Sequence, residues 1–179
     1  MKAELFQRLV DTWYDSLYRF ALSLSRNGDD ALDLTQQTFA RWAEKGHGLR
    51  DQDKAKSWLF TVLYREFIDA RRLRQREVSD EAALDRQPPE PCPIAIRIDS
   101  NTAMAALREL DPTFRAPLAL FYLENHSYKE IAEILDVPIG TVMSRISRAK
   151  EQLRIKLQNA AAGPAKVVPM RLWKEDHHG

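Results

Sequence analysis

Four prolines within six positions, at 88, 89, 91 and 93, interrupt a chain whose apolar residues otherwise recur at helical spacing. Proline lacks the backbone N–H donor and clashes with the preceding helical turn, so this cluster favours an extended linker. Acidic residues dominate the same stretch, with seven against three basic residues from Val78 to Asp111. The sequence therefore predicts two small domains, residues 1–77 and 101–159, with a proline-rich acidic linker at 78–100 and a C-terminal tail at 160–179.

The first domain is predicted to hold three helices. Apolar residues at steps of three and four from Phe6 to Leu24 predict the first helix, which we expect Asn27-Gly28 to end. Asp29 and Asp30 then place acid at the positive end of a second helix. Its predicted buried face holds Leu32, Thr35, Phe39 and Trp42, and a third helix is predicted from Lys54 to Arg76 after a polar loop. Strand-like alternation is absent, so the expected fold class is all-α, with two small helical domains.

The second domain shows start signals for three helices. Asp111-Pro112 is typical of an N-cap followed by proline at the first helical position. Ser127 and Glu130 have the spacing of a capping box, and Asp136-Val137-Pro138 predicts a tight turn before a further helix. That helix is expected to bury Ile139, Val142, Ile146, Ala149 and Leu153. The helix that begins at Asp111-Pro112 is expected to bury Phe114, Leu118, Phe121 and Tyr122.

This pattern predicts a helix-turn-helix, in which the small residues Ala132 and Gly140 would let two helices cross closely. Five basic residues and one acidic residue lie between Thr141 and Lys156. Short hydroxyl side chains followed by arginines suit entry into a DNA major groove. The candidate DNA-binding residues of the second helix are Thr141, Met143, Ser144, Arg145, Ser147, Arg148 and Lys150.

Composition excludes several other classes. The chain has 27 basic and 26 acidic residues, and Cys92 is its one cysteine, so neither an intrachain disulfide nor a multi-cysteine metal site is possible. No apolar run approaches the roughly 18 residues of a membrane span, and the N-terminus lacks a signal-peptide core. We expect a cytoplasmic protein without cofactor, metal ion or membrane insertion.

Three blocks, in order, resemble the extracytoplasmic-function (ECF) sigma factors of the sigma-70 family. The segment from Asp30 to Phe39 resembles their region 2 signature, and Ser57–Thr61 with Ile68–Arg72 resembles the helix that meets the promoter −10 element. Ser127–Arg148 resembles region 4, which reads the −35 element. The resemblance implies a transcription initiation factor that directs core RNA polymerase to promoters and helps to open the −10 region.

The resemblance also implies partners and residue roles. Asp33, Gln36, Gln37 and Arg41 would dock on the β′ clamp helices of the polymerase, region 4 would meet the β flap, and an anti-sigma factor would regulate the protein. The loop Gly46–Asp53 would capture an unstacked base. Residues implied to bind −10 DNA are Lys56, Trp58, Tyr64, Arg65, Arg71 and Arg72, with Arg74 and Arg76 as further phosphate contacts.

The sequence departs from the family pattern at three places. Tyr64-Arg65 replaces a usual Arg-Asn, Gln37 stands where a carboxylate is common, and Met143 stands where the recognition helix often has a basic residue. The −35 readout would then depend on Ser144, Ser147 and Arg148, and the preferred promoter sequence is expected to shift.

Two other functions remain open at this point. One is a helix-turn-helix regulator that acts without polymerase, against which the Asp30–Trp42 block argues. The other is an enzyme, for which Asp29, Asp30 and Asp33 could be imagined as metal ligands, although no second cluster accompanies them in the sequence.

Overall fold

The computed structural model describes residues 2–45, 52–80 and 105–160, and all regular structure in these ranges is helical. The helices form two compact units, one built mainly from α1–α3 and the other mainly from α5–α7. Within the described ranges, no helix is both long and apolar enough to cross a membrane. Most of the predicted linker, with Cys92, the tail and residues 46–51 of the predicted base-capture loop lie outside the described residues.

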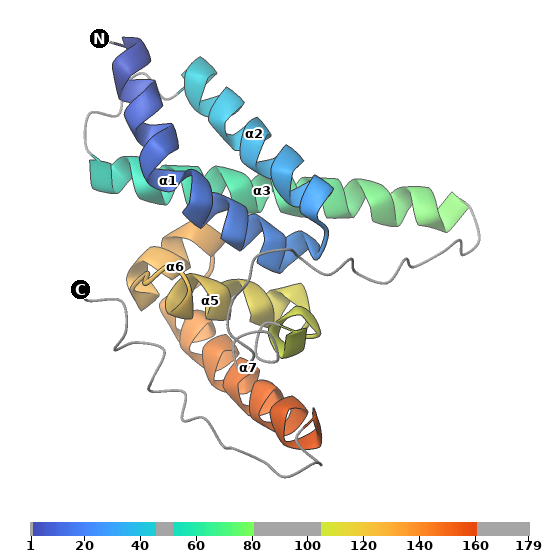
Figure 1. Ribbon diagram of the computed structural model, residues 1–179. Coiled ribbons are helices and arrows are strands. Elements are labelled where there is room, and N and C mark those ends of the chain that lie inside the picture. Colours follow the sequence, from blue (N-terminus) through green and yellow to red (C-terminus); the bar gives the residue numbers. More distant parts are fainter. Residues whose placement is uncertain (1, 46–51, 81–104, 161–179) are drawn as a thin grey trace. The chain divides into compact units, whose positions relative to one another are not determined.

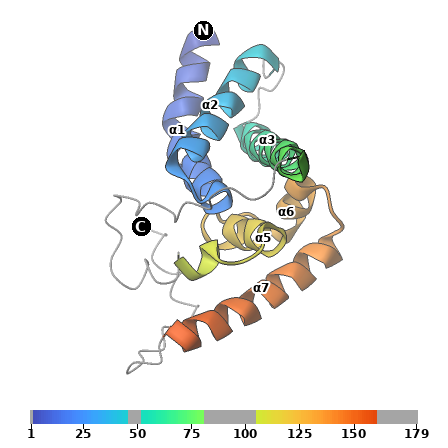
Figure 2. The same cartoon turned by 90° about the vertical axis from the view of Figure 1, so that its right-hand side faces the viewer.

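The first unit consists of α1 (Lys2–Ser25), α2 (Gly28–Lys45) and α3 (Gln52–Asp80). α1 and α2 lie side by side, and α3 crosses both of them (Figures 1 and 2). The centre of this packing is aromatic: the rings of Phe20 and Phe60, both inaccessible to solvent, have centroids 5.5 Å apart. Full burial of a side chain of this kind contributes about 1.5–3 kcal/mol, so this crossing anchors the unit.

The turn between α1 and α2 differs from the prediction. Gly28 does not end the first helix but begins the second, and Arg26 takes the left-handed conformation (φ 64°) that follows α1. The Asn27 side chain accepts a hydrogen bond from the Asp29 backbone N–H at 2.8 Å. Asn27 is therefore the N-cap of α2, a role that its short amide side chain suits.

α2 buries one continuous face, and the prediction for Phe39, Trp42 and Thr35 is confirmed. Leu32 was assigned to this face wrongly, because its side chain is 37% exposed. Leu34 and Ala31 are buried instead. The cause is the helical step: position 32 lies beside the stripe, whereas 31, 34, 35, 38, 39 and 42 follow it at alternating spacings of three and one.

α3 is longer than predicted at both ends. It continues to Asp80, so the first three residues of the predicted linker, 78–80, are helical. No proline or glycine follows Arg76 until position 88, so nothing in the covalent chain ends the helix there. The arginine run 71–76 therefore does not form the end of a helix, and the C-terminal turns of α3 project beyond α1 and α2 (Figure 1).

The second unit begins with a short helical segment at 105–108, followed by α5 (Pro112–Tyr122). The predicted cap is confirmed: the Asp111 carboxylate accepts a hydrogen bond from the Thr113 N–H at 2.8 Å, and Pro112 is in the first turn. The buried face of α5 differs from the prediction, since Phe121 and Tyr122 are only partly buried and residues 115–120 are all buried. α5 is covered on several sides, which a single amphipathic stripe does not describe.

The helix-turn-helix is formed by α6 (Tyr128–Leu135) and α7 (Ile139–Ala160). Both bonds of the predicted capping box are present, from Ser127 N–H to the Glu130 carboxylate (2.7 Å) and from Glu130 N–H to the Ser127 hydroxyl (3.3 Å). α6 ends in a Schellman motif, in which Val137 N–H donates to the Ala132 carbonyl while Asp136 is left-handed (φ 53°). Pro138 precedes α7 as its cap residue and is not, as predicted, its first helical position.

α7 buries Val142, Ile146, Ala149 and Leu153 as predicted. Ile139 was wrongly assigned to this face and is 50% exposed, because it lies in the first turn, beyond the elements that cover the rest of the stripe. Gly140 is also exposed, and a Cβ built on it meets no atom within 4 Å. The predicted role of Gly140 at a close helix crossing is therefore wrong.

The capping box makes a stability prediction. Ser127→Ala removes the acceptor for the Glu130 N–H and should lower the stability of the second unit by about 1 kcal/mol. Amide hydrogen exchange in α6 and α7 measures this, with Ser147→Ala as the control because that serine is exposed in the middle of α7. Equal exchange rates for the two variants would contradict the prediction.

Candidate polymerase and nucleic-acid interface

The outward face of α2 brings together the four predicted polymerase-binding residues. Asp33, Gln36, Gln37 and Arg41 are all exposed, whereas Leu34, Thr38 and Trp42 of the same helix are buried. Arg41 also forms an ion pair within the unit, because its Nε lies 3.0 Å from the Glu66 carboxylate of α3. This face therefore presents one carboxylate, two amides and one arginine that also ties α2 to α3.

Three of the six predicted −10 residues form a line along α3. Trp58, Arg65 and Arg72 follow one another at seven-residue steps, which places them on one side of a helix over about 20 Å. Arg65 and Arg72 are exposed. The Trp58 ring is half-buried and meets the Trp42 ring edge-on at 5.1 Å. This line offers a half-buried aromatic ring at one end and two arginines beyond it, of which Arg72 lies 3.8 Å from the Asp69 carboxylate.

The other three residues lie off this line. The Lys56 ammonium sits 5.4 Å from the centre of the Trp13 ring of α1, so it packs within the unit. Tyr64 and Arg71 are partly buried on one flank of the line. The structure therefore separates the predicted set into a row that carries two exposed arginines and three partly buried residues that lie off it.

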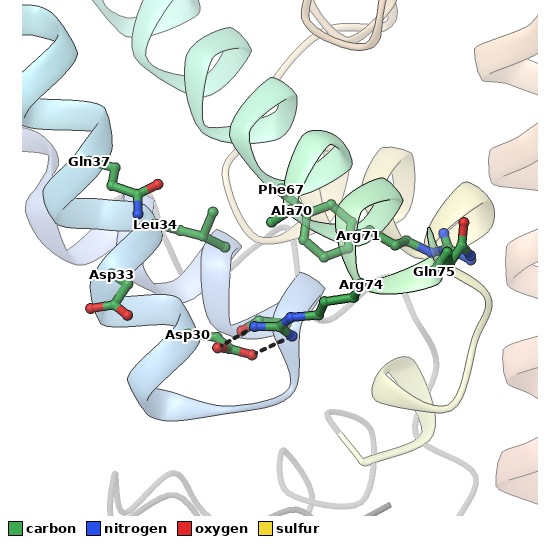
Figure 3. Close-up of a pocket in the computed structure, with 10 residues that line it drawn as sticks. Asp30, Asp33, Leu34, Gln37, Phe67, Ala70, Arg71, Arg74 and Gln75 are labelled. Atoms are coloured by element: carbon green, nitrogen blue, oxygen red, sulfur yellow. Dashed lines mark hydrogen bonds and ion pairs between the residues drawn. The ribbon is translucent and has the colours of Figure 1, made fainter. Parts of the chain in front are cut away.

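A pocket of about 440 Å³ lies between the start of α2 and the second half of α3. Figure 3 shows Asp30, Asp33, Leu34 and Gln37 on the α2 side and Phe67, Ala70, Arg71 and Arg74 on the α3 side. Residues from the predicted polymerase-binding and DNA-binding sets therefore border one cavity. Sequence spacing could not show this, because 30 or more residues separate the two sides.

An ion pair bounds this pocket. The Arg74 guanidinium donates two hydrogen bonds to the two oxygens of Asp30, at 2.7 and 2.9 Å (Figure 3). Arg74 was predicted as a phosphate contact, and in this structure its charge is compensated by Asp30 instead. The same bidentate contact uses both Asp30 oxygens, which counts against Asp30 as a metal ligand.

The predicted DNA-binding residues of α7 lie on and beside its outward face. Met143, Ser144, Ser147 and Arg148 are exposed, while Thr141, Arg145 and Lys150 are partly buried. The Lys150 ammonium lies 5.7 Å from the centre of the Tyr122 ring, and the Ser144 hydroxyl donates to the Thr141 carbonyl at 3.0 Å. Arg145 and Arg148 form no ion pair with any residue that the structure describes.

The second half of α7 is electrostatically different. Arg154 donates two hydrogen bonds to Glu151, which lower the pKa of the Glu151 carboxyl below its ordinary value. Lys156 pairs with Glu109 at 2.9 Å. Uncompensated positive charge on α7 is therefore concentrated in its first half, which follows directly from the turn of the helix-turn-helix.

Sequence reasoning missed a buried polar group in the second unit. Arg115 is 2% exposed and donates to the Arg108 carbonyl at 2.8 Å, and Glu124 and His126 are also buried. The His126 Nδ1 lies 3.9 Å from the capping-box residue Glu130. A single arginine within the apolar segment 114–123 was the one available signal, since a charge among buried positions needs polar partners.

Comparison with known proteins identifies the class. Residues 9–77 match the family model for sigma-70 region 2, and residues 100–153 match the model for sigma-70 region 4. The chain therefore has the two regions of a sigma-70 family protein, in the units where α2–α3 and α6–α7 lie.

Individual relatives narrow this further. The ECF RNA polymerase sigma factor SigE of Mycolicibacterium smegmatis is 40% identical over 156 residues, 83% of this chain but 60% of that protein. The ECF RNA polymerase sigma factor EcfG of Rhodopseudomonas palustris is 34% identical, over 77% of each chain. The structure of the sigma factor RpoE in complex with the anti-sigma factor NepR from Bartonella quintana matches with a TM-score of 0.74, at 32% identity over 86% of this chain and 96% of that one. This chain belongs to the ECF RNA polymerase sigma factors.

The Asp30–Arg74 contact makes a second prediction. Because Arg74 is largely exposed, we expect a coupling free energy of at most about 1 kcal/mol between Asp30→Asn and Arg74→Gln, decreasing as salt is added. Urea unfolding of the two single variants and the double variant measures it. Fluorescence is a suitable probe, since Trp13, Trp42 and Trp58 belong to this unit. Additive effects of the two substitutions at low salt would show that the pair does not stabilise the unit.

Proposed function

We propose that this chain directs core RNA polymerase to specific promoters as an ECF sigma factor, with its first unit at the −10 element and its second at the −35 element. One observation supports this most: α2 offers a polar face for a protein partner, and α3, packed on the same body, offers an aromatic and basic row for DNA. A helix-turn-helix regulator that acts alone would not need the first unit. As a transcription initiation factor, the chain would not itself be an enzyme, and its place of action would be the cytoplasm.

The first unit would dock on the β′ clamp helices through Asp33, Gln36, Gln37 and Arg41. Trp58, Arg65 and Arg72 would then meet the −10 strand, with Tyr64 and Arg71 at the edge of this row and Lys56 positioned by Trp13. Base–aromatic stacking and phosphate neutralisation are the two contributions expected for an opened strand. The family role of residues 46–51 in capturing a base belongs to this proposal as well.

The second unit would place the first half of α7 in the major groove and contact the β flap of the polymerase. Thr141, Met143, Ser144, Arg145, Ser147, Arg148 and Lys150 lie on or beside the surface that would face DNA. Arg145 and Arg148 are the best placed for phosphate or guanine contacts, because intramolecular carboxylates do not compensate them.

Regulation by an anti-sigma factor is part of the proposal. The similar RpoE was solved in complex with the anti-sigma factor NepR, and the present chain resembles that sigma factor over most of its length. A partner of this kind would compete with polymerase for the exposed face of α2.

Run-off transcription with core polymerase over a promoter library tests the function. The chain should confer start sites that core polymerase lacks, and Asp33→Lys should reduce core binding and transcription together by at least tenfold. Asp15→Lys is the matched control, an equal charge change at an exposed position on α1. Core binding without any start-site selection would refute the proposal.

The charge distribution on α7 gives a further prediction. Arg148→Ala should weaken promoter binding by the holoenzyme and reduce the slope of log affinity against log salt by about 0.9, the value for one lost phosphate contact. Arg154→Ala should change this slope much less, because Glu151 already compensates Arg154. Equal changes in the two slopes would contradict this assignment.

A further inference from the structure

The first turns of α7 carry two large apolar side chains that the fold does not cover. Ile139 is 50% exposed and Met143 is 52% exposed, and a spacing of four residues places them next to each other. The buried stripe of α7 is already complete without them, through Val142, Ile146, Ala149 and Leu153. Burying such a pair against an apolar group of a partner would be favourable.

The surroundings of this pair are open, since a Cβ built on Gly140 meets nothing within 4 Å. Arg145 and Arg148 follow on the same helix but lie well around its axis from the pair, because each residue turns the helix by about 100°. A DNA groove fits both features, since the start of the second helix of a helix-turn-helix approaches base edges while phosphates flank the helix. DNA is therefore the partner that this pair fits best.

The hydroxyl of Ser144 strengthens this choice. Its proton is donated to the Thr141 carbonyl at 3.0 Å, so in this structure it is not available to a base acceptor. The beginning of α7 therefore offers fewer available polar groups to bases than the sequence indicates. A larger share of the surface there is apolar. Among the four bases, only thymine presents an apolar group, its 5-methyl, in the major groove.

We infer that Ile139 and Met143 determine −35 specificity by contacting thymine 5-methyl groups, on either strand, at the base pairs that meet the first turn of α7. This inference rests on the proposed function and adds a chemical basis for its sequence preference. It also explains why a methionine replaces the basic residue that is frequent in the family at position 143: a flexible thioether fits an irregular apolar surface.

The experiment begins with the holoenzyme and a promoter library randomised at the −35 element. Enrichment of a defined sequence establishes that the protein reads this element, and a lack of enrichment would count against the proposed function itself. The inference requires at least one enriched A·T pair. A selected element made of G·C pairs alone would overturn the inference and leave the proposed function intact.

Each thymine of the selected element is then replaced singly by deoxyuridine, which removes only the methyl group. Loss of one buried methyl corresponds to about a fourfold change in affinity. We expect a three- to fivefold loss of holoenzyme affinity at one or two positions. The same deoxyuridine replacements are then tested with the Met143→Ala and Ile139→Ala variants. At the thymine that the removed side chain contacts, deoxyuridine should change the affinity of the variant holoenzyme less than 1.5-fold.

Ile155→Ala is the matched control, since Ile155 is 45% exposed on the same helix but three turns further on. It should keep the full response to deoxyuridine. Hydrogen exchange in α6 and α7 checks that each variant keeps its fold. Indifference of the wild-type protein to every deoxyuridine, or an undiminished response in both variants, would overturn the inference. The inference would also be overturned if the two variants bound promoter DNA normally and lost only the binding of a protein partner.

Discussion

The packing of α3 across α1 and α2 is the constraint on which the interface of the first unit depends. Phe20 and Phe60 fill the crossing, and Leu59, Leu63 and Phe67 continue the buried side of α3. Once this side is fixed, the helical repeat directs Trp58, Arg65 and Arg72 outward together. The same packing leaves the polar face of α2 exposed, so a single apolar core orients both candidate binding surfaces.

Electrostatic contacts then modify what these surfaces offer. Three ion pairs are Asp30–Arg74, Glu66–Arg41 and Glu151–Arg154. Each pair reduces the charge available to a partner without removing the residue from the surface. Surface pairs of this kind add little stability. Their larger effect is therefore to leave Arg65 of α3 and Arg145 and Arg148 of α7 as the arginines of these surfaces without a carboxylate partner among the described residues, whereas Arg72 lies 3.8 Å from Asp69.

Much of the fold could be predicted because local signals decide it. Contacts within a few residues form the capping box at Ser127–Glu130 and the cap at Asp111. The helical spacing of apolar residues indicates most of the buried faces of α2 and α7. Predictions failed where a neighbouring element decides burial, as at Leu32, Ile139 and Gly140. The candidate site shows the same division, since the sequence proposed residues of α2, α3 and α7 for it but could not show the contacts that Arg41, Lys56 and Arg74 make with Glu66, Trp13 and Asp30.

The sequence by itself determined the all-helical fold class, the caps at Asp111 and Ser127 and the family to which the chain belongs, since periodicity, start signals and motif order are properties of the linear chain. Tertiary structure alone decided which exposed residues are available to partners. Asp30 and Arg74 are 44 residues apart in sequence, yet their contact depends on how α3 crosses α2. Ile139 is half exposed although Val142 in the same turn is buried, so the packing of the described helices stops short of the first residue of α7, which its spacing in the chain does not reveal.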